Sequence, residues 1–275
     1  MDMRFEIIPA QEVSLAEQAK AFTDAFAGYL IGSIELDTAG MARFLSGQGA
    51  DLYYSRFARE KNGPLAGFGF INRTGNVPRL AGMGTVPFAR RSGVAAYLLT
   101  QLIEEAQARR DEAMVLEVFE QNAPAVALYR RYGFKEQMQL FGWRHKNNGE
   151  CGEANHLVEI SLLAAAGMPR ALDYPEIPWQ ISRFAVVKLP GRAFRIDDTC
   201  IVISEPDVGP IRVHSIIGNN RKEQAQNVLK ALLAKFAPRE FFAPQIFPEP
   251  FGIDVFEPAG FVREPLNQFL MLRNL

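Results

Sequence analysis

Residues 80–96 read LAGMGTVPFARRSGVAA, an apolar stretch that gives way to a basic turn with a glycine and then to an amphipathic segment. The first part is typical of a buried strand, and the part after Gly93 is typical of a helix. The first N–H groups of a helix have no partner within the helix and carry partial positive charge, so this turn can hold a phosphate. The turn alone leaves a second interpretation open, in which Gly93 only relieves backbone strain.

The chain before this turn is predicted to form two helices and an antiparallel meander. Ser14 and Glu17 make an S-x-x-E capping box ahead of a helical run, and a shorter helix is predicted at residues 38–45. The turn-forming stretches KNGP and RTGNVP separate the last three strand-like segments, which is typical of a meander. Strands are predicted at residues 5–8, 51–59, 65–71 and 80–86.

The chain after this turn is predicted to cross over to a parallel strand. Apolar residues recur at helical spacing from Gly93 onward, and residues 113–119 form a short apolar strand. A strand, a helix and a second strand in this order predict a parallel pair. Asn122 is a natural N-cap for the next helix and Gly133 a natural stop, after which residues 134–143 are predicted to form another strand.

The hydrophilic run at residues 145–155 indicates a domain boundary, and the order of elements then recurs. The strand-like run at residues 157–163 could complete either half. Beyond it, strands are predicted at residues 182–188, 193–203 and 211–217, with a helix at 221–236. Gly133-Phe134 recurs as Gly260-Phe261, which supports an internal repeat. We therefore predict an α+β fold with two similar domains, residues 1–150 and 151–275. Each should have a mixed, mainly antiparallel sheet with a β-α-β crossover and flanking helices.

The composition is that of a globular protein with balanced charge. The 275 residues are 48% hydrophobic, and 30 Lys and Arg against 31 Asp and Glu give a formal net charge of −1. This balance argues against binding of nucleic acid and against attachment to an anionic membrane. Cys151 and Cys200, without CxxC spacing, predict neither a metal site nor a disulfide framework. No apolar run reaches the length of a membrane span, so we expect a cytoplasmic protein.

Two segments, GTVPFARRSGVA and LEVFEQNAPAVALYRRYGF, together resemble the GNAT superfamily of acyl-CoA-dependent N-acyltransferases. The T-x-P-x-x-R-x-x-G-x-A pattern that begins at Thr85 is similar to the pyrophosphate loop of that family, and the order of residues from Asn122 to Phe134 is similar to its second motif. The resemblance implies acetyl-CoA as co-substrate, without a metal. A plain N-cap is the alternative for Asn122. The cofactor-binding residues that the resemblance implies are Gly84, Thr85, Arg90, Arg91, Ser92, Gly93, Val94, Ala95, Ala96 and Asn122.

The same resemblance implies catalytic roles for two side chains. Tyr129 occupies the family position of the general acid that protonates the CoA sulfur, and a core tyrosine is the alternative. Many relatives carry a carboxylate on the strand before the loop, but here no Asp or Glu lies between Glu60 and Glu104. Glu117 sits where ribosomal-protein N-terminal acetyltransferases use a glutamate as base. A salt bridge at the strand edge is the alternative for Glu117, and deprotonation through water is the alternative route.

The second domain is predicted to be a degenerate copy without the cofactor site. A carboxylate in place of the loop glycine would repel a pyrophosphate, and a phenyl ring has no proton to donate. The repeat also suggests that the turn can form without glycine, which favours a bound phosphate as the reason for Gly93. By the spacing of the repeat, Asn220, Glu223 and Phe256 correspond to Arg90, Gly93 and Tyr129.

These observations predict an N-acetyltransferase that transfers the acetyl group of acetyl-CoA directly to a primary amine in a ternary complex. The acceptor is a small-molecule amine or a protein N-terminal amine, and a homodimer is left open. The resemblance implies an acceptor pocket at the first helices and meander loops, which carry Phe26, Tyr29, Tyr53 and Tyr54. A non-catalytic acyl-CoA sensor or interaction module is the alternative, because the upstream carboxylate is missing.

Overall fold

The structure of this protein is a computed structural model that describes residues 4–146, 156–168, 177–218 and 222–275. The chain forms two compact units, unit 1 with Met1–Glu136 and Met271–Leu275, and unit 2 with Gln137–Leu270. The predicted domain boundary between residues 150 and 151 lies outside the described residues, so the predicted division stays a prediction.

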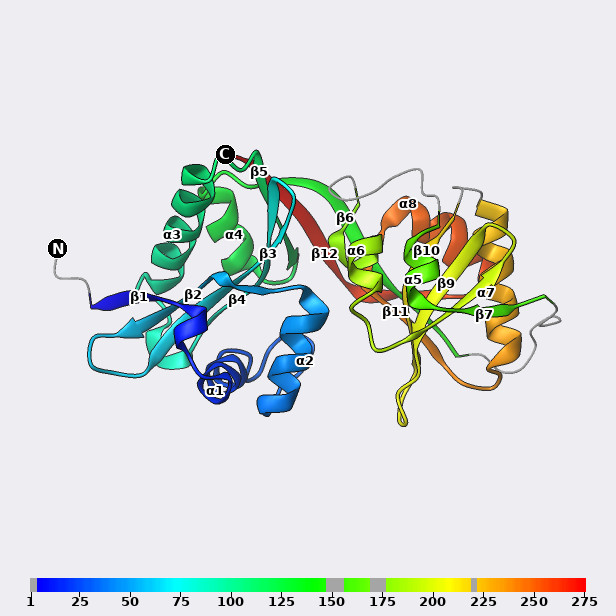
Figure 1. The fold of residues 1–275 in the computed structure, drawn as a ribbon, viewed down its shortest axis with the longest axis horizontal. Helices are drawn as coiled ribbons and strands as arrows, with labels where there is room; N and C mark the ends of the chain where they lie inside the picture. Colours follow the sequence, from blue (N-terminus) through cyan, green and yellow to red (C-terminus); the bar gives the residue numbers. More distant parts are fainter. Residues whose placement is uncertain (1–3, 147–155, 169–176, 219–221) are drawn as a thin grey trace. The chain divides into compact units, whose positions relative to one another are not determined.

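Unit 1 is a sheet with helices on both faces (Figure 1). Its sheet has the order β1-β2-β3-β4-β5, and the last residues of β12 lie next to β5. β1 to β4 are antiparallel, whereas β4 and β5 are parallel with Arg79 opposite Val115. The predicted meander and crossover are therefore confirmed. The elements are β1 (Phe5–Pro9), α1 (Leu15–Ala25), α2 (Thr38–Gln48), β2 (Asp51–Glu60), β3 (Leu65–Thr74), β4 (Val77–Thr85), α3 (Val94–Ala108), β5 (Ala113–Phe119) and α4 (Ala123–Arg131).

Capping residues set the ends of the helices of unit 1. The predicted capping box is present, because Ser14 and Glu17 satisfy each other's backbone N–H groups at the start of α1. Asn122 caps α4 as predicted, and Gly133 follows that helix with a left-handed φ of 82°. The cap of α2 is Asp37, whose side chain accepts a hydrogen bond from the N–H of Gly40.

The side chains of β3 alternate between two kinds of contact, which places helices on both faces of the sheet. Phe68 stacks on Phe22 of α1 with ring centroids 5.6 Å apart. Gly69 points to the opposite face, where a Cβ atom would lie 2.5 Å from Cδ1 of Leu102 in α3. Glycine therefore lets α3 approach the sheet closely, while phenylalanine fills the space below α1.

Unit 2 repeats part of this arrangement. Its sheet has the order β12-β6-β11-β10-β9-β8-β7, and β10 and β11 are parallel like β4 and β5. Gly260 precedes β12 with a left-handed φ of 84°, as Gly133 precedes β6. The elements are β6 (Lys135–His145), β7 (Val158–Ile160), α5 (Leu162–Ala166), α6 (Arg183–Val186), β8 (Arg192–Ile196), β9 (Thr199–Ser204), β10 (Ile211–Ile217), α7 (Lys222–Lys235), β11 (Phe241–Pro248), α8 (Glu249–Phe251) and β12 (Val262–Asn274).

Three predicted strands of unit 2 were wrong in part or in full. The segment at 182–188 forms the short helix α6 after a turn that begins at Pro178. The segment at 193–203 is a hairpin, because the chain turns at Asp197 with a left-handed φ of 47°. The segment at 157–163 keeps only the three residues of β7, since Ser161 caps α5. In the last two segments a polar cap or turn residue interrupts an apolar run and ends the strand.

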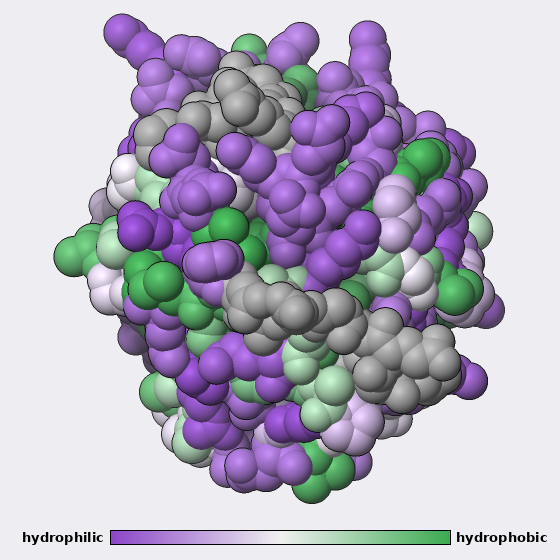
Figure 2. Space-filling model, turned by 90° about the vertical axis from the view of Figure 1, so that its right-hand side faces the viewer, coloured by the Kyte–Doolittle hydropathy of each residue, from purple (hydrophilic) through white to green (hydrophobic). Residues whose placement is uncertain are grey.

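The surface turned to the viewer in Figure 2 is mostly hydrophilic, with apolar residues in small separate groups. Single exposed apolar residues are ordinary on protein surfaces and mark no interface by themselves. None of the described helices combines the length and the apolar character that crossing a membrane requires.

Candidate active site

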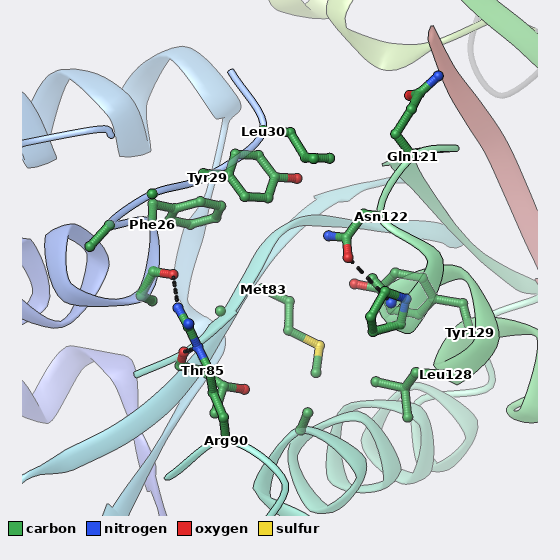
Figure 3. A pocket seen from close by; sticks show the side chains of 17 residues that line it. Phe26, Tyr29, Leu30, Met83, Thr85, Arg90, Gln121, Asn122, Leu128 and Tyr129 are labelled. Carbon is green, nitrogen blue, oxygen red and sulfur yellow. Dashed lines mark hydrogen bonds between the residues drawn. The ribbon is translucent and has the colours of Figure 1, made fainter. Parts of the chain in front are cut away.

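A pocket of about 520 Å³ lies in unit 1, where the C-terminal ends of α1 and β4 meet the N-terminal ends of α3 and α4 (Figure 3). The register of the parallel pair joins Arg79 to Val115 and Leu80 to Leu116, and the pocket is lined by later residues of β4. The lining consists of Ala25, Phe26, Ala27, Gly28, Tyr29, Leu30, Met83, Gly84, Thr85, Arg90, Ala95, Gln121, Asn122, Pro124, Ala125, Leu128 and Tyr129.

Tyr129 projects from α4 into this pocket (Figure 3). Its side chain is 8% exposed, and its ring packs edge-on against Phe134 with centroids 5.8 Å apart. Burial raises the pKa of the Tyr129 hydroxyl well above its ordinary value, and the neighbouring Tyr29 raises the pKa further. The hydroxyl is therefore protonated and uncharged at neutral pH.

Asn122 joins the cap of α4 to the opposite side of the pocket. Its Oδ1 accepts a hydrogen bond from the N–H of Ala125 at 3.4 Å, and its side chain also hydrogen-bonds the side chain of Tyr29. Burial raises the pKa of Tyr29, and the hydrogen bond to Asn122 opposes that rise. Asn122 therefore caps α4 and also lines the pocket. From the sequence alone, the cap was an alternative to a binding role.

Arg90 connects the loop before α3 to the end of α1. Its Nη2 donates to the carbonyl of Ala25 at 3.2 Å, and its Nε donates to the carbonyl of Thr85 at 3.5 Å. These bonds hold a positive charge at the pocket wall beside the start of α3. That position suits an anionic group better than a cationic one.

The N-terminus of α3 leaves room for an anion. Gly93 is the N-cap residue and has no side chain to cap the first N–H groups of the helix. A Cβ atom at Gly93 would meet nothing within 4 Å, so the space beside Gly93 is open. An uncapped helix N-terminus beside an arginine suits a phosphate group.

The backbone itself also requires a glycine at this turn, which corrects the comparison drawn from the repeat. Gly93 has a left-handed φ of 88°, a conformation that costs other residues energy. Glu223 is not its structural counterpart, because α7 begins at Lys222 and Glu223 lies inside the first helical turn. Backbone strain therefore explains Gly93 as well as a bound phosphate does.

The structure brings six of the predicted site residues together in the pocket and leaves the others outside its lining. Arg91, Ser92, Gly93, Val94 and Ala96 belong to the turn and the first residues of α3 beside the pocket. The residues in the lining are Gly84, Thr85, Arg90, Ala95, Asn122 and Tyr129.

Of the aromatic residues expected around the acceptor, two line the pocket and two do not. Phe26 and Tyr29 are in the lining, whereas Tyr54 lies under the guanidinium groups of Arg73 and Arg109 on another part of unit 1. Tyr53 packs edge-on against Tyr54. Phe26 continues the helical spacing of α1, and this pattern can be read from the sequence. For the tyrosines, no sequence pattern distinguishes a side chain in the pocket from one elsewhere on the surface.

Glu117 forms a buried ion pair outside this lining. Its Oε2 lies 2.8 Å from Nε of Arg79, and both side chains are 3% exposed. Arg79 also donates to the side chain of Gln48 at 3.1 Å. These contacts match the salt bridge that the sequence left open for Glu117, and its role as base stays a prediction.

The corresponding part of unit 2 is filled by packed side chains. Phe256 is fully buried, with its ring 5.0 Å from the ring of Phe247 and 6.0 Å from that of Trp143. Asn220 lies outside the described residues. Among the residues that the structure describes, no group of three or more His, Cys, Asp or Glu side chains could hold a metal ion.

Comparison with known proteins finds similarity in the first unit. Residues 12–134 match the acetyltransferase (GNAT) family. The [ribosomal protein bS18]-alanine N-acetyltransferase of Escherichia coli strain K12 is 34% identical over 93 residues, which are 34% of this chain and 62% of that relative. The chain thus spans less than two thirds of the length of this relative.

Solved structures resemble the chain over its full length. A putative acetyltransferase from Pyrococcus horikoshii superposes with a TM-score of 0.70 at 14% identity, over 100% of this chain and 91% of the other. A tandem GNAT protein from the clavulanic acid biosynthesis pathway superposes with a TM-score of 0.64 at 14% identity, over 98% of both chains. At these identities the likeness concerns the fold alone.

Proposed function

We propose that this protein transfers an acetyl group from acetyl-CoA to a primary amine, on the premise that its residues 12–134 belong to the acetyltransferase (GNAT) family and that the whole chain has the tandem GNAT fold. The observation that carries the proposal is a buried, protonated tyrosine in a pocket beside an open helix N-terminus. Acetyl-CoA supplies the activated acyl group.

In this proposal the start of α3 and Arg90 hold the pyrophosphate. The N–H groups after Gly93 offer hydrogen bonds, and the guanidinium of Arg90 adds positive charge. Arg91, Ser92, Val94 and Ala96 contribute through the backbone of the same turn. Gly84 and Thr85 at the end of β4 and Asn122 at the start of α4 orient the arm that carries the thioester.

Tyr129 is the proposed general acid. As the amine nitrogen bonds to the acyl carbon, the carbon–sulfur bond breaks and Tyr129 donates its proton to the departing sulfur. The phenolate then takes a proton from solvent. The amine must reach the pocket neutral, and it loses one proton after attack. Transfer through water is the proposed route for that proton, because Glu117, the base predicted from the sequence, is already paired with Arg79.

The name of one relative suggests a class of acceptor. The Escherichia coli relative is named for acetylating an alanine of ribosomal protein bS18. A protein amine is therefore a proposed acceptor here beside a small-molecule amine.

Removing the Tyr129 hydroxyl tests the proposal. We expect Tyr129→Phe to lower kcat about a hundredfold, because general acid catalysis is lost, while the Kd for acetyl-CoA by calorimetry changes less than about twofold. Tyr132→Phe is the control, since the Tyr132 hydroxyl accepts a hydrogen bond from Thr100 outside the pocket lining. Equal turnover of the Tyr129→Phe and Tyr132→Phe variants would contradict the proposed acid.

A non-catalytic acyl-CoA sensor is the second candidate function. The observation that favours it is that the described pocket lining contains no carboxylate that could serve as base. Calorimetric binding of acetyl-CoA without thiol release across a panel of amines would support this candidate against the transferase.

A further inference from the structure

The charges of the pocket restrict the acceptor. Arg90 carries the only full charge among the described residues of the pocket lining, and it is positive. Tyr29 and Tyr129 stay neutral because burial raises the pKa of both hydroxyls. Glu117 lies outside the lining and is already paired with Arg79. A second ammonium group in this pocket would lose water without meeting a carboxylate.

The side of the pocket formed by Phe26, Tyr29 and Leu30 is apolar and well packed. Phe26, Tyr29 and Leu30 lie together on one side, opposite Asn122 and Tyr129 (Figure 3). The ring of Phe26 contacts the ring of Phe22 with centroids 4.6 Å apart and meets the ring of Tyr29 edge-on at 4.9 Å. These contacts keep the wall from collapsing, so an apolar chain can lie against it.

Leu30 extends this wall to the rim of the pocket. It sits in a short loop between Gly28 and Gly32, both with left-handed φ, and the N–H of Gly32 donates to the carbonyl of Tyr29 at 2.9 Å. Leu30 is 44% exposed and lines the pocket, whereas its neighbour Ile31 is 54% exposed and does not. The loop therefore presents one of two similar side chains to the pocket.

We propose that the acceptor of this protein is a primary amine on an apolar chain without a second positive charge, and that Leu30 contacts this chain. The proposal rests on the proposed transferase function and names its substrate class. It excludes diamines and polyamines as preferred acceptors, because the described pocket lining offers no anion to replace their water.

Two amines with the same carbon chain test this proposal. Pentylamine and 1,5-diaminopentane differ only in the second ammonium group, and release of free CoA gives kcat/KM for each. We expect the wild-type protein to favour pentylamine about tenfold or more, after the diamine rate is halved for its two equivalent ends. A preference for the diamine would overturn the proposal and leave the transferase function intact.

A matched pair of variants tests the role of Leu30. We expect Leu30→Glu to reduce the preference for pentylamine about tenfold, because the new carboxylate can pair with the second ammonium. Ile31→Glu adds the same charge one residue away and should keep the wild-type preference. Equal effects of the two variants would overturn the assignment of Leu30.

Calorimetry with acetyl-CoA separates failure of this inference from failure of the proposed function. A Kd for acetyl-CoA within about twofold of wild type shows that a variant is folded and can be compared. If the wild-type protein binds acetyl-CoA but releases no CoA with either amine or with an alanine-terminated peptide, the transferase function itself fails, and the acceptor class fails with it.

Discussion

At the scale of single residues, the pocket combines three polar side chains whose contacts cross from one side to the other. Asn122 caps α4 and also hydrogen-bonds Tyr29, which in turn raises the pKa of Tyr129. A substitution of any one of them should therefore alter the contacts or the pKa of the other two.

The raised pKa of Tyr129 predicts the form of the pH profile. A tyrosine with an ordinary pKa near 10 would begin to lose its proton above about pH 9, whereas a raised pKa moves that loss to higher pH. We expect kcat/KM with pentylamine to rise with pH as the amine becomes neutral, without a descending limb below about pH 10. Thiol release corrected for spontaneous hydrolysis measures this profile. A descending limb with an apparent pKa near 8 would contradict the assignment.

The buried pair of Arg79 and Glu117 predicts a large change in stability. Glu117→Gln leaves the guanidinium buried without its carboxylate, so we expect the free energy of unfolding in urea to fall by about 3 to 5 kcal/mol. Replacing both members, as in Arg79→Met with Glu117→Leu, should restore much of that loss because no uncompensated charge remains.

The double variant also decides between the two roles that the sequence left open for Glu117. We expect it to keep turnover near the wild-type value, as the salt-bridge role requires. A double variant that unfolds like the wild type but has lost at least about a hundredfold in kcat would instead support Glu117 as the base.

At the scale of elements, the turn between β4 and α3 places a backbone requirement and a binding surface at the same residue. Arg91 and Gly93 both have left-handed φ, and Gly93 is followed directly by the uncapped first turn of α3. The glycines of β3 let α3 pack closely on the sheet, and this packing holds the start of α3 next to the turn.

Gly93→Ala and Gly75→Ala distinguish the need for glycine in the backbone from a role of Gly93 in phosphate binding. Both glycines have left-handed φ and open space around a Cβ atom, so each change should cost about 1 to 2 kcal/mol of folding free energy through strain alone. Only Gly93 adjoins the pocket, and we expect Gly93→Ala alone to weaken acetyl-CoA binding, by about tenfold or more. Equal Kd values for the two variants in calorimetry would contradict a phosphate at this turn.

At the scale of the whole molecule, two units of one fold differ in what their cores contain. In unit 1 the position of Tyr129 opens to a pocket, while its counterpart Phe256 is packed among Phe247 and Trp143 in unit 2. The last residues of β12 belong to unit 1, where the N–H of Leu275 donates to the carbonyl of Glu112 at 3.1 Å.

This difference predicts one acetyl-CoA site in each chain. Unit 2 has a buried phenyl ring where unit 1 has its tyrosine, and an acidic residue lies in the first turn of α7. We expect a calorimetric stoichiometry of one acetyl-CoA per chain. A stoichiometry near two would mean that the second unit has kept a working site.

Local features of the fold could be predicted because neighbours in sequence produce them. The capping box of α1, the cap at Asn122, the stop at Gly133 and the parallel pair of β4 and β5 all follow from spacing over a few residues or one crossover. The position of Tyr129 and of the loop at Arg90 came from motifs of the same short range. Apolar runs in the second half were less reliable, because Ser161 and Asp197 each ended a strand that periodicity alone would continue.

The tertiary structure decided which of these residues meet. Arg79 and Glu117, Asn122 and Tyr29, and Arg90 and Ala25 are each separated by more than thirty residues, and no spacing rule pairs side chains at that distance. The sequence of this protein thus determined the elements of its first unit, since hydrogen bonds and side-chain periodicity within an element are local. The charge of its pocket and the partner of Glu117 depended on packing between elements, because only packing sets which side chains share the same buried space.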